Sequence, residues 1–240
     1  MDNVDRRSPA DLRTAFLVSA ALLALVMAFS GSFGARAASA STAASTAAAL
    51  PPPSPGRQLI TVTADAYEES TATLVAYTAK NGRWVKTYGP WTANVGESGI
   101  APPGQKREGD GRTPSGTYGF DFMFGVKPDP GVRFPYRQAL SHDKWNDDSA
   151  SPLYNTWVDA RHADPGVTPE NMMNPPVYDY GAVITYNTEN RTPRLGSAIF
   201  LHVSNGGPTS GCVSLPVDKL LQVLRWMDPK HSPRIDIRVA

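Results

Sequence analysis

The sequence predicts a mostly β domain, a sandwich or partly open barrel, with one main helix. Three observations support this fold class: alternating apolar and polar residues near both ends of the folded part, short apolar runs bounded by turn residues, and one segment with helical spacing. The chain has 23 Lys and Arg against 22 Asp and Glu. A chain with this charge balance does not have the excess of basic residues that is typical of a nucleic-acid binder, so no nucleic-acid partner is expected.

The N-terminal part has the composition of an export signal followed by a linker. Arg6 and Arg7 precede an apolar run at residues 15–29, which is shorter than the roughly 20 residues of a membrane span. Residues 1–37 are therefore predicted to be a signal peptide, or an N-terminal anchor if uncleaved, and this segment is the only expected membrane contact. Residues 38–56 are rich in Ala, Ser and Pro, which predicts a linker ahead of an exported domain at residues 57–240.

The first half of this domain begins with strand patterns. Apolar and polar residues alternate at residues 58–64 (QLITVTA) and 71–78 (TATLVAYT), which predicts two half-buried strands. Asn81-Gly82 follows directly and precedes RWVKTYG. An Asn-Gly pair between two strand patterns is the strongest short-range signal of a β-hairpin, so a third strand is expected after it.

The second half combines loops, buried strands and the helix. Residues 94–179 are dense in Gly, Pro, Asp and Asn, which predicts loops with a few strands. Nearly continuous apolar runs at residues 181–186 and 197–203 predict buried strands. Residues 217–227 carry apolar side chains at helical spacing, and residues 234–239 alternate again as a last strand.

The single cysteine, Cys212, lies in a Gly- and Ser-rich turn ten residues after His202, in the stretch LHVSNGGPTSGCVSL. A thiol attacks as the thiolate, and a nearby imidazole can take its proton. Glycines in the turn allow the chain to double back, so we expect His202 and Cys212 to meet. The backbone N–H groups of Ser210, Gly211 and Cys212 are then candidates for an oxyanion hole. The alternative is a buried structural cysteine beside an unrelated histidine.

The segments SAIFLHV and TSGCVSLP, together with KREGDGRTPSGTY at residues 106–118, resemble the L,D-transpeptidase catalytic domain (YkuD-like) family. The resemblance implies an L,D-transpeptidase-like β-sandwich or partly open barrel in which Cys212 is the nucleophile and His202 the general base. It also implies a cell-wall enzyme that forms a thioester with peptidoglycan stem peptides, works on the outer side of the membrane and reacts with carbapenem-type inhibitors. Cysteine–histidine chemistry requires no cofactor.

The sequence departs from the family pattern in three places: at two positions, and in a gap between the histidine and the cysteine that is shorter than in many members. Ser210 stands where the family has a histidine before Gly-Cys, and Ser214 stands where Asn or Arg is common. Three functions therefore remain open: a transpeptidase that forms cross-links, an L,D-carboxypeptidase that trims stem peptides, and a non-catalytic wall-binding module with the same fold.

Candidate substrate-binding residues lie ahead of the cysteine turn. Lys106 and Arg112 carry cations that suit a stem-peptide carboxylate, and the alternative for their segment is a solvated turn. Tyr154, Asn155 and Asn187 belong to segments that also resemble the family. The remaining histidines lie in polar loops without ligand spacing, so no metal site is predicted.

Overall fold

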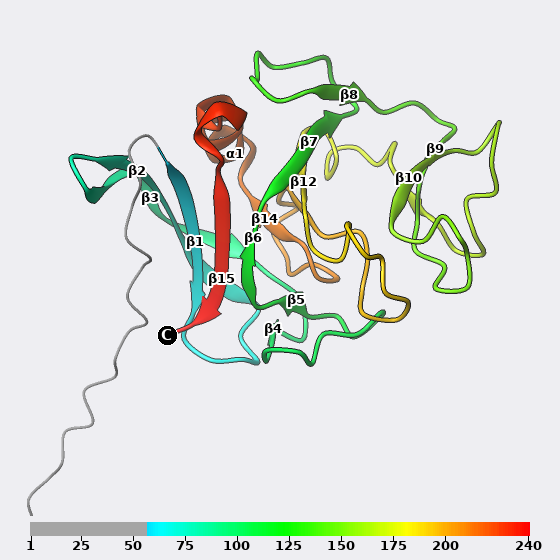
Figure 1. Cartoon of the computed structure of the whole chain (residues 1–240), viewed down its shortest axis with the longest axis horizontal. Helices are drawn as coiled ribbons and strands as arrows, with labels where there is room; N and C mark the ends of the chain where they lie inside the picture. Colours follow the sequence, from blue (N-terminus) through cyan, green and yellow to red (C-terminus); the bar gives the residue numbers. More distant parts are fainter. Residues whose placement is uncertain (1–56) are drawn as a thin grey trace, which may run out of the picture. The chain divides into compact units, whose positions relative to one another are not determined.

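The computed structural model describes residues 57–240, and the predicted signal segment and linker lie outside the described residues. Within this range, ten strands form one sheet in the order β6-β15-β1-β2-β3-β14-β13-β12-β7-β8, which curls into a half-barrel (Figure 1). One α-helix, α1 (Val217–Trp226), lies near the C-terminal end of the chain. The predicted fold class, mostly β with one main helix, is confirmed.

The N-terminal strands form the hairpin that the Asn-Gly pair predicts. Strands β1 (Gln58–Ala64), β2 (Thr71–Lys80) and β3 (Arg83–Asn94) pair antiparallel in sequence order. At the β2–β3 turn, Asn81 and Gly82 have φ values of 50° and 71°. Positive φ at both central residues is the requirement of a type I′ turn, which Asn and Gly meet at low cost.

The other half of the sheet contains the strands around the cysteine turn. Strand β14 (Val213–Leu215) pairs antiparallel with β3 and parallel with β13 (Phe200–Val203). Strands β12 (Gly181–Ile184) and β7 (Phe120–Gly125) continue the sheet beyond β13. The remaining elements are β4 (Ile100–Ala101), β5 (Thr113–Pro114), β6 (Gly116–Tyr118), β8 (Tyr136–Gln138), β9 (Asp143–Asn146), β10 (Thr156–Asp159), β11 (Glu170–Asn171), β15 (Arg234–Val239) and a 3₁₀ turn at Pro229–His231.

Two groups of buried side chains cover the two faces of the sheet at β13 and β14. Leu201 belongs to the larger core, which also contains the buried face of α1, while Phe200 and Cys212 belong to a smaller, aromatic core. Successive side chains of a strand point to opposite faces. His202, two residues after Phe200, therefore shares the face of Cys212.

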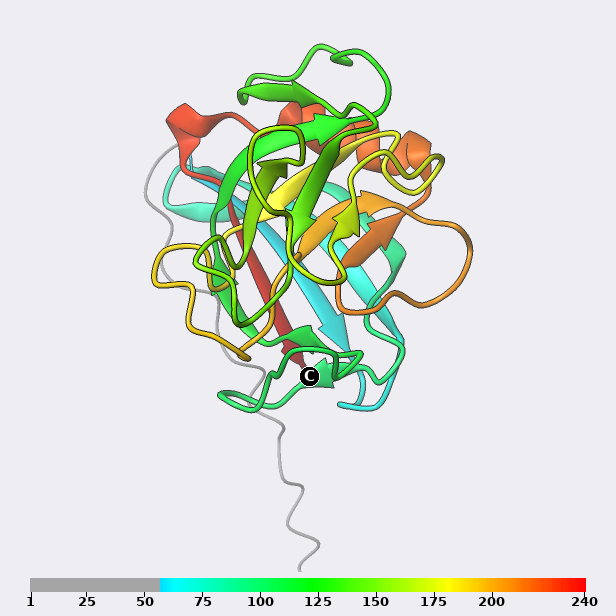
Figure 2. The ribbon, with the colours of Figure 1, turned by 90° about the vertical axis from the view of Figure 1, so that its right-hand side faces the viewer.

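Element boundaries differ from the predicted ones by a few residues. The helix ends at Trp226, because Met227 already has extended ψ of 131°. Strand β13 begins at Phe200 rather than at residue 197, since Ala198 has φ 53°, outside the strand region. The middle region, residues 94–179, consists of loops with short strands, as predicted. Figure 2 shows these loops, in green and yellow, in front of the strands β1 and β15.

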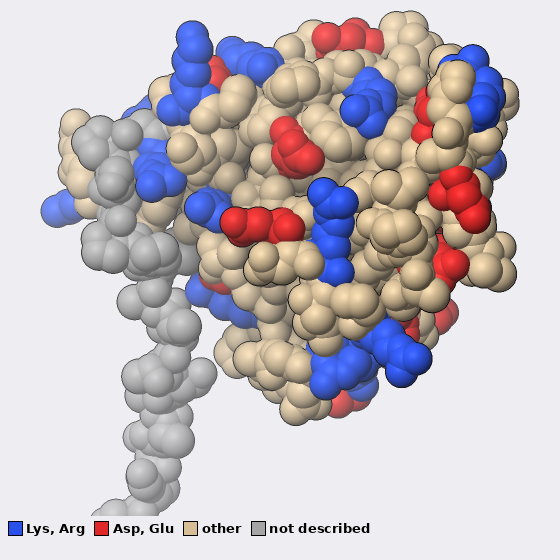
Figure 3. Space-filling model, turned by 45° about the vertical axis from the view of Figure 1, so that its right-hand side comes forward, with Lys and Arg blue, Asp and Glu red and all other residues tan. Residues whose placement is uncertain are grey.

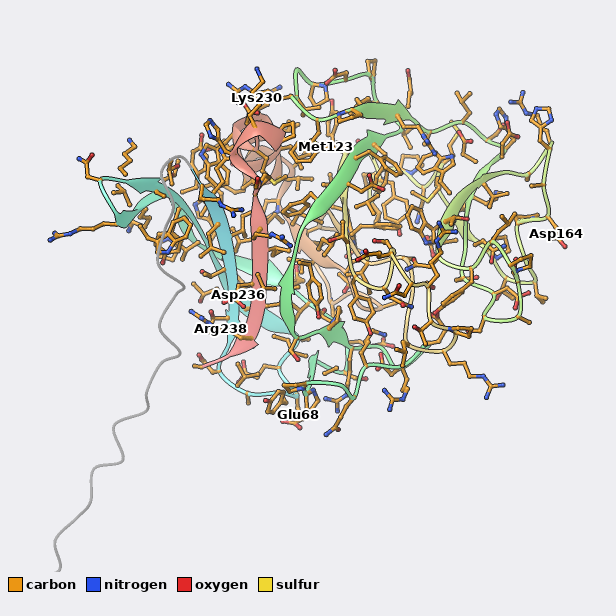
Figure 4. The ribbon with its side chains drawn as sticks, viewed as in Figure 1. Glu68, Met123, Asp164, Lys230, Asp236 and Arg238 are labelled. Atoms are coloured by element: carbon orange, nitrogen blue, oxygen red, sulfur yellow. The ribbon has the colours of Figure 1, made fainter. Side chains whose placement is uncertain are left out.

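Charged side chains of both signs are mixed on the face of the molecule that Figure 3 shows. Figure 3 shows Lys and Arg interspersed with Asp and Glu on one face, and on β15 Asp236 pairs with Arg238 at 2.9 Å (both labelled in Figure 4). No helix among residues 57–240 is long and apolar enough to cross a membrane. The same residues contain no cluster of His, Cys, Asp and Glu suited to a metal ion.

Candidate active site

Cys212 is placed by hydrogen bonds from two threonines. The Thr209 hydroxyl donates to the Cys212 carbonyl at 2.7 Å, and the Thr113 hydroxyl donates to the same oxygen at 3.3 Å. The turn itself is tied to the end of β3, because the Thr209 N–H donates to the Val95 carbonyl at 2.9 Å. Gly211 has φ 147°, a backbone conformation that favours glycine. The turn therefore presents the thiol from a fixed backbone.

The thiol is buried and protonated at neutral pH. Its Sγ donates to the Ala198 carbonyl at 3.2 Å and accepts the Phe200 N–H at 3.3 Å, and Cys212 is 8% exposed. Burial raises the pKa of the Cys212 thiol to about 12; the Phe200 N–H opposes this shift, the Glu170 carboxylate adds to it, and Lys106 opposes it. The resting group is therefore S–H and not the thiolate.

His202 is a neutral imidazole with a fixed tautomer. It is 6% exposed, and burial lowers its pKa to about 4. Its Nδ1 lies 2.9 Å from the Val203 carbonyl oxygen. Because a carbonyl oxygen only accepts hydrogen bonds, Nδ1 carries the proton and Nε2 retains its lone pair. The imidazole is thus held in the form that can accept a proton.

His202 and Cys212, which the sequence is expected to bring together, both line one cavity of about 380 Å³. His202 lies in β13 and Cys212 directly precedes β14, the parallel neighbour of β13, in which Ser214 is the register partner of His202. No hydrogen bond joins His202 to Cys212 among the residues that the structure describes. The other lining residues are Lys106, Glu108, Gly109, Asp147, Glu170, Asn174, Val177, Tyr178, Ser197, Ala198, Ile199, Asn205, Pro208, Thr209, Ser210 and Gly211.

The three residues expected to supply oxyanion-hole amides all border this cavity. Ser210 and Gly211 line it next to Cys212. The Gly211 N–H donates to the Thr209 hydroxyl at 3.1 Å, so this amide already has a partner in the structure. A developing oxyanion would have to compete with that hydroxyl for the Gly211 N–H.

Of the five expected substrate-binding residues, Lys106 lines the cavity. Its Nζ donates to Asp110 Oδ1 at 2.7 Å and to the Arg107 carbonyl at 2.5 Å, so a carboxylate already offsets its charge. Arg112 lies outside the lining, and its guanidinium donates to the Ile100 carbonyl at 3.2 Å.

The other three expected residues, Tyr154, Asn155 and Asn187, also lie outside the lining of this cavity, and substrate contact by them stays a prediction. The Tyr154 hydroxyl donates to the Glu108 carboxylate. Asn155 is 3% exposed; its Oδ1 accepts from Trp145 Nε1 at 2.9 Å and from the Ala198 N–H at 3.1 Å. Asn187 holds its own loop by accepting from the Thr192 N–H at 2.8 Å. These three polar side chains make hydrogen bonds within the protein: Tyr154 to a carboxylate, Asn155 to two buried N–H groups, and Asn187 to the backbone of its own loop.

Sequence reasoning missed the acidic and aromatic side of the cavity. Glu108, Asp147, Glu170 and Tyr178 line it, and all four come from the irregular region between β3 and β12. Burial raises the pKa of Asp147 to about 6, and the neighbouring carboxylates Glu108 and Glu170 add to the shift. Glu108 lies in the segment 106–118 that resembles the family, whereas no spacing or motif in the sequence marks Asp147, Glu170 or Tyr178.

Comparison with known proteins agrees with the geometry. The family model described as the YkuD L,D-transpeptidase catalytic domain matches residues 68–237, most of the chain, and this range includes both His202 and Cys212. No curated protein and no solved structure matches the chain. The chain therefore belongs to the YkuD family, and this membership implies an L,D-transpeptidase-like activity on peptidoglycan.

Proposed function

We propose that the protein cross-links peptidoglycan by acyl transfer through a thioester on Cys212, with His202 as the general base. The observation that carries this proposal is the shared cavity of about 380 Å³, which both side chains line. A neutral imidazole with a free Nε2 is the form that general-base catalysis requires. Peptidoglycan stem peptides are the substrates that the family implies.

The proposed reaction begins with proton transfer during attack. Cys212 Sγ releases its hydrogen bond to Ala198, gives the proton to His202 Nε2 and attacks the carbonyl of the diamino acid at position three of the stem. His202 returns that proton to the departing nitrogen as the bond to the terminal D-alanine breaks, which leaves the thioester. An acceptor amine then attacks the thioester, loses a proton to His202 and forms the new amide, and the proton restores the thiol. A preformed thiolate–imidazolium pair is not the starting state, since burial opposes both charges.

We infer cross-linking rather than hydrolysis from the residues that line the cavity. Residues of the middle region, among them Lys106, Glu108, Asp147 and Glu170, form one side of it. A wall over the thioester limits access of water, and an amine held beside the thioester gains a high effective molarity. Both effects support an amine acceptor.

The first test of this proposal is acylation of the purified protein by a carbapenem, followed by intact mass spectrometry. We expect addition of one molecule, and Cys212→Ser should abolish the adduct. His202→Ala should slow acylation by about 10²- to 10⁴-fold, the usual contribution of a positioned base. His162→Ala is the matched control, because the His162 side chain is 77% exposed. A wild-type protein that stays unmodified would support the non-catalytic wall-binding module.

The second test separates the two possible acyl acceptors. The protein is incubated with a disaccharide-tetrapeptide, and the products are identified by mass. A dimer that lacks one D-alanine results from an amine acceptor, and we expect it to exceed the tripeptide monomer at high substrate concentration. Tripeptide alone would assign the protein to the L,D-carboxypeptidases.

A further inference from the structure

Tyr178 is fixed between the ends of two strands beside the cavity. Its turn precedes β12, and the Tyr178 N–H donates to the Asn174 carbonyl at 2.8 Å. The Val126 N–H, after β7, donates to the Tyr178 carbonyl at 2.8 Å, and the Val203 N–H of β13 donates to the Val177 carbonyl at 3.2 Å. The backbone at Tyr178 is therefore anchored to both β7 and β13.

The Tyr178 ring packs edge-to-face against three other rings. Its centroid lies 5.6 Å from that of Phe124, 5.8 Å from that of Phe200 and 5.5 Å from that of His202, with interplanar angles of 77°, 83° and 84°. Two of these partners are fully buried phenylalanines, so the ring has little freedom to move. The third partner is the imidazole of the proposed base.

The strand beside His202 leaves room for this aromatic packing. Gly181 of β12 is the register partner of His202. A Cβ at Gly181 would lie 2.7 Å from the Phe124 ring, so any larger residue would displace the ring that supports Tyr178. On the cavity side, burial raises the pKa of the Tyr178 hydroxyl well above its ordinary value, and the nearby Cys212 thiol and Glu170 carboxylate add to this shift.

We propose that Tyr178 is a positioning residue for the acyl transfer, whose ring holds the His202 imidazole with Nδ1 on the Val203 carbonyl and Nε2 available to Cys212. This inference rests on the proposed function. The hydrogen bond through Nδ1 alone does not prevent rotation of the imidazole about that contact, and the packed Tyr178 ring blocks this rotation. A small misplacement of a reacting group costs about 10²-fold in rate, so loss of the ring should slow acylation by about 10- to 100-fold.

The test compares three variants of the full chain. Tyr178→Leu removes the ring, and Tyr178→Phe keeps it but removes the hydroxyl. Phe122→Leu is the matched control, since the partly buried Phe122 packs against the same aromatic core, on Trp145 and Trp157. Two quantities are measured: the rate of acylation by a carbapenem, and the tautomer of His202 from its ¹⁵N chemical shifts. The tautomer is a readout that a loss of stability alone does not move.

We expect Tyr178→Leu to slow acylation by about 10- to 100-fold and to lose the pure Nδ1–H tautomer. Tyr178→Phe and Phe122→Leu should keep the wild-type tautomer and acylate at rates close to wild type. A folded Tyr178→Leu that matches wild type in both measurements would overturn the inference. So would a Tyr178→Phe variant as slow as Tyr178→Leu, because the hydroxyl would then be the important group.

The wild-type protein provides an independent test that needs no variant. We expect an Nδ1–H tautomer and nuclear Overhauser contacts between the His202 and Tyr178 rings. A wild-type His202 without them overturns the inference even if Tyr178→Leu does not fold. A wild-type protein that shows this tautomer but does not react with the carbapenem contradicts the proposed function and leaves the placement of His202 standing.

Discussion

Burial of neutral His202 should make the stability of the protein depend on pH below about 6.5. The pKa of His202 falls from its ordinary 6.5 to about 4 in the folded protein, because burial opposes the charged form. The folded state therefore binds the proton less tightly than the unfolded chain, so this contribution is complete above the unfolded pKa and is lost as the pH falls through 6.5 towards 4. Each tenfold difference in proton affinity is worth about 1.4 kcal/mol, which gives about 3 kcal/mol lost between about pH 7 and pH 4.

Urea unfolding followed by tryptophan fluorescence at a series of pH values measures this loss. Other groups also contribute as the pH falls: burial raises the pKa values of Asp147 and Glu170, so protonation of these carboxyl groups makes the folded state more stable. The His202 contribution is therefore the difference between wild type and His202→Gln, and we expect this difference to change by about 3 kcal/mol over the range. A difference that stays constant from pH 7 to pH 4 would refute the reasoning that His202 is neutral because it is buried.

Two further predictions concern residues that support the thiol. Gly211→Ala should slow acylation of Cys212 at least about 10-fold, because residue 211 has φ 147° and an added Cβ would lie 3.0 Å from a backbone oxygen. The rate is measured by intact mass spectrometry, and an unchanged rate would show that the turn adapts to the added Cβ. Asn155→Ala should lower the free energy of unfolding in urea by about 1–3 kcal/mol for each buried partner left without a hydrogen bond. Equal stability of this variant and wild type would contradict the structural role given to Asn155.

The sequence predicted the parts of the fold and site that depend on local pattern. Alternation located β1 and β15, and the Asn81-Gly82 pair located the first hairpin because only a few residue types adopt positive φ at both positions. The sequence could predict that His202 and Cys212 lie near each other, because the two residues flank one short turn. The start of β13 was misplaced, since the positive φ of Ala198 has no signature in an apolar run.

The remainder of the site depends on contacts between segments far apart in the chain. Tyr178 and Glu170 come from the middle region, where the local pattern predicts only loops, and their positions follow from hydrogen bonds to other strands. Asn155 was expected at the substrate because its segment resembles the family. In the structure its amide oxygen accepts from the buried Trp145 Nε1 and Ala198 N–H, and a sequence does not distinguish an amide that binds substrate from one that binds other parts of the protein.

The parallel pairing of β1 with β15 also determines when the domain can fold. Leu59 lies beside Arg234, and β15 pairs with β6 on its other side (Figure 1). Until residues 234–239 have been synthesised, β1 and β6 both keep an unpaired edge, which is a template for association with other chains. Pairing across such a sequence separation is slow, because the chain must close a long loop before the contacts form. The domain therefore completes this sheet only after β15 has been synthesised.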